Sequence, residues 1–483
     1  MALVWPRGLG WLAAALVLAY VAAYLGHPAL PGNNIDYPLG WWGWWDQSLY
    51  LKSLRAFAGR NLASAEHWYP PGYALLGAPF SRAFRTHPFF FVDLACLLAT
   101  ARLFMAFAGR VGVGPQVAGA VFAGVTLLDW RMLDAWAVPW STTPTAVCLW
   151  AMLVLAADHL AGRARPLLLG ALPAAVLLLR PSDLVVPALI LAVVGLHEAA
   201  LWWRQPDQRG AVLRRVAWLV AGGAAGGLAA IAVHVAIHGV AASPYMLHSA
   251  TLGFDLHAYG WKAYVLLVEP RGWYGDGTGL IARHPWIALS VIGLPFALMA
   301  GSAMRLLVLV VVAQLALYVA YVDLLPTGLW RYGNVHYWKW FMPGLALIAV
   351  VGLRGLRAAP RAWAAGAVVA GLLVLAIRID AVPAAPGQAV RALDLPGPSP
   401  GWAETYFAPL AITDAAGPMR NIYEMRLVPF GTGIRAIGLR RDFVLPLADW
   451  PGMERGPAQP LAARTRIDWF CWLPPYGCKR PGG

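Results

Sequence analysis

Residues 40–80 read GWWGWWDQSLYLKSLRAFAGRNLASAEHWYPPGYALLGAPF, and the fold depends on whether this stretch crosses a membrane or lies on its surface. Its end, YPPGYALLGAPFSRAF from residue 69, is too short and too interrupted by proline to cross a hydrocarbon core of roughly 30 Å. Counting it as a span would also turn Arg163 and the arginines of residues 204–215 outward, although Lys and Arg favour the inner side. We therefore interpret residues 40–80 as a surface segment between two spans.

The composition is that of a membrane protein. Hydrophobic residues make up 60% of the 483 and charged residues 12%, whereas soluble domains carry roughly 25% charged residues. We expect an all-α polytopic membrane protein with about eleven transmembrane helices of roughly 20 residues or slightly fewer. The expected spans lie near residues 9–25, 88–107, 115–129, 141–158, 166–180, 184–203, 216–238, 286–303, 306–322, 338–353 and 362–380.

The positions of the positive charges predict the orientation. The net charge of +14 could indicate a nucleic-acid partner, but the arginines lie in loops between the apolar runs, which argues against one. With a cytoplasmic N-terminus, every inner loop is basic, through Arg7, Arg110, Arg163, Arg165, Arg204, Arg209, Arg214, Arg215, Arg305, Arg354, Arg357 and Arg361. This orientation predicts a multi-pass protein of the bacterial inner membrane. Residues 1–25 resemble a cleavable signal peptide, but the many later spans favour a first transmembrane helix.

The same topology predicts two domains. Residues 1–380 form the transmembrane domain, with a first outer loop at 26–87 and a second large outer loop at 239–285. Residues 381–483 begin with the Pro- and Gly-rich AVPAAPGQAVRALDLPGPSPGW and form a small periplasmic domain, expected to be α+β. The run VAGGAAGGLAA, residues 220–230, lies inside a span, and its small residues predict close helix packing instead of a phosphate-binding loop.

Within the first outer loop, residues 45–62 predict an amphipathic helix along the membrane interface. Leu49, Leu54, Phe57 and Leu62 alternate with basic residues at near-helical spacing. Asp46 falls at the start of this helix, where a carboxylate can cap free N–H groups and is favoured by the helix dipole. The tryptophans on either side fit anchoring at the headgroup level.

An acid after the first span, an interfacial helix and a YPPGY-LL segment together resemble the first outer loop of the GT-C membrane glycosyltransferases. Protein O-mannosyltransferases and lipid A aminoarabinose transferases belong to that superfamily. The resemblance covers residues 9–80 in their motifs and the remainder only in topology. It implies an inverting transfer of a sugar, hexosyl or pentosyl, from a polyprenyl-phosphate-linked donor to an acceptor hydroxyl of a lipid, polysaccharide or protein at the periplasmic face.

The resemblance implies that Asp46 is the catalytic general base. A carboxylate within hydrogen-bond reach can take the proton of the attacking hydroxyl, and burial among the neighbouring tryptophans would raise its pKa. The family pattern often has two adjacent acids, but here Gln47 follows Asp46 and Asp36 is the only other acid before Glu66. A divalent cation, Mg or Mn, therefore stays open as a cofactor. Capping or interface anchoring is the alternative role of Asp46, and the two roles are compatible.

A departing polyprenyl phosphate needs cations aimed at its oxygen. The best candidates are Arg331, His336 and Lys339 in LPTGLWRYGNVHYWKW, although an aromatic belt with snorkelling cations explains the same pattern. Arg180 in LLLRPSDLVVP is a second candidate, or it pairs with Asp183 in a turn. Arg271 is a candidate phosphate ligand in the second outer loop.

Three further donor-facing candidates, Glu66, His67 and Tyr69, precede or begin the YPPGY segment, and Asp36 is a candidate substrate-binding residue earlier in the same loop. Asp255 and His257 are two residues apart, which is weak as a metal signature. Cys471 and Cys478 flank a Pro-Pro turn and can form a disulfide if this end is periplasmic, whereas Cys96 and Cys148 fit packing positions inside spans.

Two other functions fit the same layout. A flippase or transporter of a lipid-linked sugar would share the basic and aromatic outer rim, but it would place ionisable residues at mid-membrane and often carry an internal repeat. No convincing repeat is present. An envelope polysaccharide polymerase would also be polytopic. The gathering of polar residues at one face favours catalysis at the outer surface.

Overall fold

The computed structural model describes residues 8–31, 42, 45–252, 254, 259, 263, 266–268, 278–321, 324 and 334–358, together with short strands beyond residue 390. The chain divides into two compact units. The first comprises Met1–Leu247, Leu289–Leu315 and Val335–Ala367, and the second comprises His248–Ala288, Ala316–Asn334 and Val368–Gly483. The candidate site lies entirely within the first unit.

Five helical segments of the described chain are long and apolar enough to cross a membrane: Phe90–Arg110, Thr142–Leu160, Pro181–Arg204, Pro206–His238 and Ser302–Ala320. They contain the helices α4, α7, α9 (Val185–Arg204), α10 (Arg209–His238) and α16. Shorter apolar helices are α1 (Gly10–Gly26), α5 (Pro115–Leu127), α8 (Pro166–Leu179), α15 (Ile287–Met299) and α18 (Met342–Ala358). The helical, membrane-spanning character is thus supported by length and composition. The eleventh expected span, 362–380, lies outside the described residues, and the count of eleven stays a prediction.

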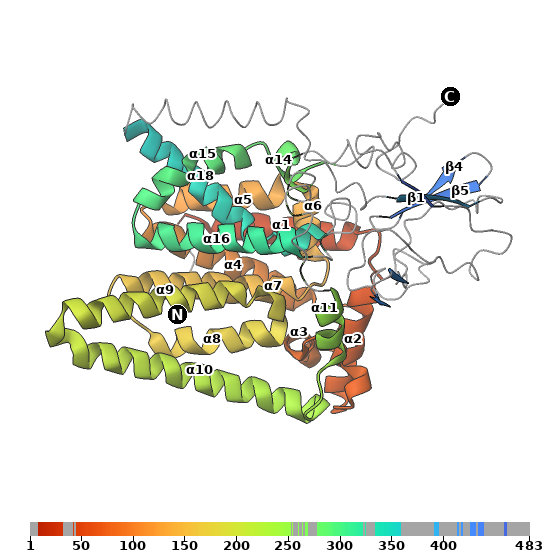
Figure 1. The fold of residues 1–483 in the computed structure, drawn as a ribbon, viewed down its shortest axis with the longest axis horizontal. Coiled ribbons are helices and arrows are strands. Elements are labelled where there is room, and N and C mark those ends of the chain that lie inside the picture. The colour runs from red at the N-terminus through yellow and green to blue at the C-terminus, as the bar shows by residue number, and fades with distance from the viewer. Residues whose placement is uncertain are drawn as a thin grey trace. The chain divides into compact units, whose positions relative to one another are not determined.

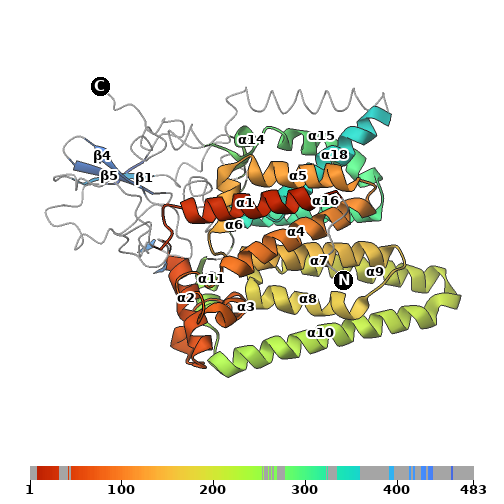
Figure 2. The ribbon, with the colours of Figure 1, turned by 180° about the vertical axis from the view of Figure 1, so that it is seen from behind.

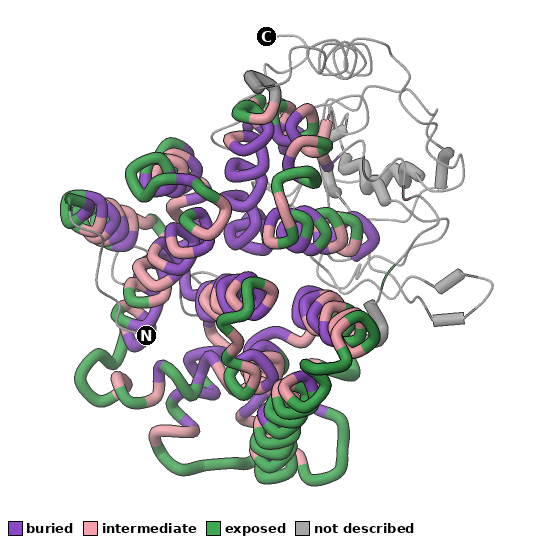
Figure 3. Tube along the Cα trace, turned by 90° about the vertical axis from the view of Figure 1, so that its left-hand side faces the viewer, coloured by how far each residue is buried: buried purple, intermediate pink, exposed green. Residues whose placement is uncertain are grey.

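The outward side chains of these helices fit a lipid environment. Large apolar residues are exposed on α9 and α10, among them Leu196, Trp203, Trp218 and Leu228. Figure 3 shows buried positions on the sides of the helices that face one another and exposed positions on the outer sides. In water such a surface would be unfavourable, because contiguous apolar patches on soluble monomers are small.

The first outer loop forms short helices, as the sequence predicted. Helix α2 (Trp45–Ala58) buries Tyr50, Leu51 and Leu54 and exposes Lys52 and Arg55, so its amphipathic character is confirmed. It ends four residues earlier than predicted, so Leu62 lies outside it and is exposed. After η2 (Ser64–Glu66), the YPPGY segment folds into α3 (Pro71–Gly77) and η3 (Ala78–Phe80). Helix α3 is only 7 residues long and starts at a proline, which is favoured at the first helical position.

Glycines bring α8 and α10 into close contact. A Cβ on Gly170 would lie 2.0 Å from the carbonyl oxygen of Leu219, and one on Gly222 would lie 2.1 Å from that of Leu167. Both distances are too short for any side chain, so only glycine allows this approach. The packing predicted from the Gly-rich run is confirmed, and Figure 1 shows α8, α9 and α10 side by side.

Helices α4 and α7 run parallel through the first unit and define its two ends. Phe104 of α4 contacts Trp150 of α7 edge to face at 5.1 Å, and Arg110 at the end of α4 binds Asp158 near the end of α7. The connection between α5 and α7 contains α6 (Trp130–Ala137), which the sequence analysis missed. The Asp129 side chain caps α6 by accepting a hydrogen bond from the Arg131 backbone N–H at 2.9 Å. Figure 2 shows α1, α4, α5 and α6 from the opposite side.

The second unit contains the short helix α14 (Leu280–Arg283) and the described strands of the C-terminal region. Strands β4 (Arg426–Phe430), β5 (Gly433–Gly438), β1 (Arg391–Leu395) and β6 (Ala458–Pro460) form an antiparallel sheet in that order. Strands β2 (Thr413–Asp414) and β3 (Gly417–Pro418) pair separately. The α+β character expected for residues 381–483 stays a prediction, because these strands are all that is described there.

Candidate functional site

Asp46 lies in the first turn of α2 and accepts a hydrogen bond from the hydroxyl of Tyr69. The ring of Tyr69 packs against Tyr50 at 4.7 Å and against Tyr245, in the first turn of α11 (Pro244–Leu252), at 5.3 Å. Burial raises the pKa of Tyr69, and the negative charge of Asp46 raises it further. Tyr69 therefore stays protonated and keeps donating its hydrogen bond to the Asp46 carboxylate.

Tyr50 connects Asp46 to the rest of the site. Its hydroxyl lies 3.2 Å from the Ser141 Oγ, and the side chain is 3% exposed. Burial raises the pKa of Tyr50 and the Asp46 carboxylate raises it further, whereas the hydrogen bond to Ser141 and the charge of Arg180 lower it. The Asp46 carboxylate and the Arg180 guanidinium thus both influence the Tyr50 hydroxyl electrostatically. We call Asp46, Tyr50, Tyr69, Ser141 and Arg180 the aspartate cluster.

Arg180 follows α8 directly and contacts residues of two other elements. Its Nε lies 3.4 Å from an oxygen of Asp183 in η4 (Pro181–Asp183), and its guanidinium carbon lies 4.1 Å above the ring of Tyr337. Gln314 of α16 donates to the other oxygen of Asp183 at 3.1 Å. The pairing of Arg180 with Asp183 is therefore present, and it places the guanidinium beside the aromatic residues of the site.

His336 in η6 (Asn334–Tyr337) sits in an aromatic stack next to Arg180. Its ring is parallel to Trp140 at 3.7 Å and stacks on Tyr337 at 4.1 Å. Its Nδ1 lies 3.1 Å from the Thr142 hydroxyl in the first turn of α7. Burial lowers the pKa of His336 well below its usual value, and the charges of Arg180 and Lys339 lower it further. The imidazole is neutral at pH 7 and cannot supply a cation to a phosphate.

Lys339 is buried, with 1% of its surface exposed, so the snorkelling interpretation does not fit it. Its ammonium donates to the Ala135 carbonyl at 2.8 Å and the Thr143 hydroxyl at 2.5 Å, and it lies 4.9 Å from the Trp136 ring. Burial lowers the pKa of Lys339 to about 7, although the nearby carboxylate of Asp93 opposes the shift. Through these hydrogen bonds, Lys339 connects the segment that follows η6 to α6 and α7 in the interior of the helical unit.

Two sequence candidates lie apart from these contacts. His67 is buried, with its Nδ1 2.8 Å from the Ser53 hydroxyl and its Nε2 2.9 Å from the Asn61 carbonyl oxygen. Both ring nitrogens are thus used in holding the loop to α2. Glu66 forms a half-exposed ion pair with Lys52 at 3.5 Å. Neither residue contacts the aspartate cluster in the described structure.

Several candidates lie outside the described residues: Asp36, Asp255, His257, Arg271, Arg331, Cys471 and Cys478. The expected surroundings of Asp46 also differ in part. Trp42 packs against Tyr24 at 4.8 Å and His27 at 5.5 Å, beside the end of α1. The aromatic side chain described at the Asp46 carboxylate is Tyr69, through its hydrogen bond.

The sequence analysis missed several residues of the site. Tyr50 and Tyr245 look like ordinary interfacial tyrosines, and nothing in their spacing relates them to Asp46. The segment VPWSTTP, residues 138–144, could have indicated part of the site, because three consecutive residues with hydroxyl side chains interrupt an apolar region. Ser141, Thr142 and Thr143 from this segment contact Tyr50, His336 and Lys339 in turn.

Among the described residues, His, Cys, Asp and Glu side chains do not gather in threes that could hold a metal ion. Cys96 and Cys148 are free thiols in α4 and α7. No protein-family model matches the chain, and no curated protein or solved structure is similar enough to match it.

Proposed function

We propose that this protein is an integral membrane glycosyltransferase of GT-C type that uses a polyprenyl-phosphate-linked sugar donor. The observation that carries the proposal is the aspartate cluster. In it, the Asp46 carboxylate accepts a hydrogen bond from Tyr69, and this carboxylate and the Arg180 guanidinium both interact electrostatically with the buried Tyr50, at one end of the apolar helices. Base and phosphate ligand are the two functions that transfer from a polyprenyl phosphate requires.

In the proposed reaction, the acceptor hydroxyl gives its proton to Asp46 while its oxygen forms a bond to the anomeric carbon. The bond from that carbon to the phosphate oxygen breaks, and polyprenyl phosphate leaves with the electron pair. Attack opposite the leaving group inverts the configuration. Tyr69 orients the carboxylate, and Arg180 offsets the negative charge of the phosphate. Mg or Mn stays open as a cofactor, as do the sugar and the acceptor.

The same proposal places the site at the periplasmic face of a bacterial inner membrane. The support is the distribution of arginines: Arg110, Arg163 and Arg165 lie at the opposite end of α4 and α7 from the aspartate cluster, as expected for inner loops. Residues 381–483 would then be periplasmic.

A flippase for a lipid-linked sugar is the second candidate, and one observation favours it. Asp93 is fully buried in the first turn of α4, where it accepts a hydrogen bond from Tyr73 at 2.8 Å and interacts electrostatically with Lys339. Buried ionisable residues in apolar helices often belong to transport pathways. An Asp93→Asn variant that abolishes movement of the lipid while leaving any transfer intact would favour this candidate.

The test is to offer a panel of radiolabelled polyprenyl-phospho-sugars to the full chain in liposomes. We expect sugar transfer or donor hydrolysis in the wild type and roughly 10²-fold or greater loss in Asp46→Asn, because a general base contributes about that much. Glu66→Gln is the matched control, since Glu66 lies apart from the cluster, and it should retain wild-type turnover. Transbilayer movement of the donor without transfer, equal in all three proteins, would contradict the proposal.

A further inference from the structure

A cavity of about 630 Å³ lies at the end of α7 remote from the aspartate cluster. It is lined by Ala106, Gly109 and Arg110 of α4, Asp158 of α7, and Arg163 and Arg165 of the loop that leads to α8. Its size falls within the range of small-molecule sites, about 300–1,000 Å³. None of these residues takes part in the proposed transfer reaction.

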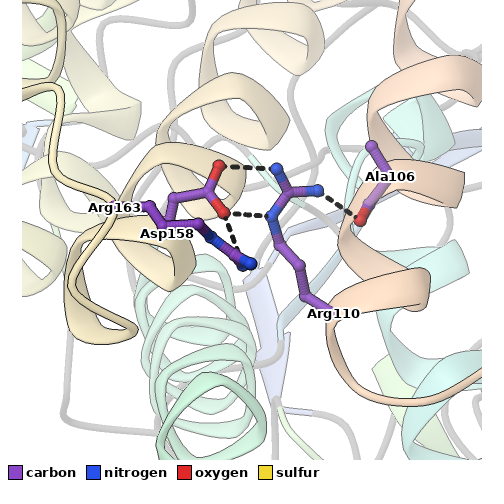
Figure 4. Close-up of polar contacts among 4 residues, drawn as sticks. All are labelled: Ala106, Arg110, Asp158 and Arg163. Atoms are coloured by element: carbon purple, nitrogen blue, oxygen red, sulfur yellow. Dashed lines mark hydrogen bonds and ion pairs between the residues drawn. The ribbon is translucent and has the colours of Figure 1, made fainter.

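The lining of the cavity contains three arginines and one aspartate. Figure 4 shows the polar contacts among Ala106, Arg110, Asp158 and Arg163. Arg110 binds Asp158 through two hydrogen bonds of 2.9 and 2.5 Å and donates a third to the Ala106 carbonyl at 2.6 Å. Arg163 donates to the same carboxylate at 2.9 Å. Asp158 neutralises one of the three arginines, so the lining keeps an excess of two positive charges.

The remaining donors point to an anionic ligand. Arg163 uses one of its five N–H donors in the described contacts, and its side chain is 67% exposed. Arg165 is exposed and forms no hydrogen bond or ion pair with the described part of the chain. Forked guanidinium groups match phosphate geometry, whereas paired arginines without a ligand would only repel each other.

Gly109 lines the cavity without a side chain. A Cβ at this position would meet nothing within 4 Å, so packing inside the protein does not require the glycine. A larger side chain there would project into the cavity. Because α4 and α7 are apolar and both meet the cavity at their ends, its level corresponds to the headgroup region of a bilayer.

We infer that this cavity binds a phosphate group, with Arg163 and Arg165 as its ligands and the Arg110–Asp158 pair holding Arg163 in place. The headgroup phosphate of an anionic phospholipid is the source that fits its level in the helical unit. This inference is independent of the proposed transferase activity, since it involves the opposite end of α7.

The experiment titrates the detergent-solubilised full chain with phosphatidylglycerol, phosphatidylcholine or inorganic phosphate and follows the melting temperature, because a ligand of the folded state raises it. We expect phosphatidylglycerol to stabilise the wild type more than phosphatidylcholine does. In Gly109→Leu and Arg165→Gln the half-saturating concentration should rise about tenfold, as expected when a charge-assisted contact is lost. A shift with inorganic phosphate that shows the same sensitivity would identify free phosphate as the ligand.

Two matched variants serve as controls. Gly195→Leu places a leucine on the open face of α9, and Arg214→Gln removes an exposed arginine of α10 outside the cavity. Both should titrate like the wild type. The inference is overturned if phosphatidylglycerol and inorganic phosphate stabilise no more than phosphatidylcholine, or if all variants titrate alike.

Discussion

The two ends of α7 carry charged residues in opposite ways. At the Thr142 end, Lys339 and Arg180 are buried beside aromatic rings. The Lys339 ammonium donates to a carbonyl and a hydroxyl, and Arg180 pairs with Asp183. At the Leu160 end, Arg110, Arg163 and Asp158 bind one another around an open cavity. About 28 Å of helix separates them, at 1.5 Å per residue over the 19 residues of α7.

This difference indicates different roles. Burial strengthens electrostatic interactions and shifts pKa values, and catalytic sites use both effects. Burying charged groups also lowers the stability of the fold. Solvent-exposed arginines lower the stability of the fold very little, and their N–H donors are available to an external ligand. The following predictions test this contrast between a buried and an open set of charges.

The largest effect on stability is expected from Asp93→Ala at the buried end. The substitution leaves the Tyr73 hydroxyl without its acceptor and removes a favourable interaction of Lys339. We expect the free energy of unfolding to fall by about 3 kcal/mol, measured by denaturant titration in detergent. Asp207→Ala, at an exposed position of η5 (Pro206–Gln208), should change it by less than about 0.5 kcal/mol. Equal effects of the two substitutions would contradict the contrast.

Removal of the Tyr69 hydroxyl should lower turnover about tenfold, the effect of about 1.4 kcal/mol, because Asp46 loses the donor that orients it. The measurement compares turnover of Tyr69→Phe and Tyr20→Phe in liposomes. Tyr20 donates to the Phe90 carbonyl at 3.0 Å, away from the cluster, and its variant should keep wild-type turnover. Unchanged turnover in Tyr69→Phe would show that this hydrogen bond has no catalytic role.

Lys339 predicts a pH dependence of stability. Its pKa of about 7 in the folded protein lies below the usual value of 10.5, so the unfolded chain binds more protons between these values. Stability should therefore rise with pH from about 7 to 10, by at most about 1.4 kcal/mol per pH unit. The difference in unfolding free energy between the wild type and Lys339→Met should follow this rise, whereas a constant difference would contradict it.

The smallest effect is expected at the open end. Asp158→Asn removes the partner of Arg110 and Arg163, but the groups are partly solvated, with Arg110 and Asp158 side chains 21% and 16% exposed. We expect a loss below about 1 kcal/mol in the free energy of unfolding. A loss as large as that of Asp93→Ala would mean that both ends are structurally equivalent.

Much of the helical framework follows from the sequence, because long apolar runs, interfacial amphipathicity and small-residue spacing are local signals. The positions of α2 and α10 and the close approach of α8 and α10 at Gly170 and Gly222 show this. Helix α6 was missed because its eight residues contain both charges and tryptophan and are too short for a clear period. The sequences of the strands near the C-terminus do not alternate apolar and polar residues in a way that would predict their pairing.

The site was predictable only in part. Asp46 and Tyr69 are 23 residues apart, and the YPPGY pattern suggested that they belong to one loop, but their hydrogen bond depends on how that loop folds back. Arg180, His336 and Ser141 are far apart in sequence, and no local period relates them. Their meeting is a consequence of helix packing, which a single sequence does not specify.

The most direct test of the catalytic claim is the single-turnover rate of donor cleavage by Asp46→Asn, with donor binding measured on the same samples. Asn keeps the size of the side chain and its hydrogen-bonding ability but cannot accept the proton of the acceptor hydroxyl. The account predicts unchanged donor binding and a rate lowered by roughly 10²-fold or more. A rate equal to that of the wild type at full donor occupancy would contradict it and leave Asp46 as the cap of α2.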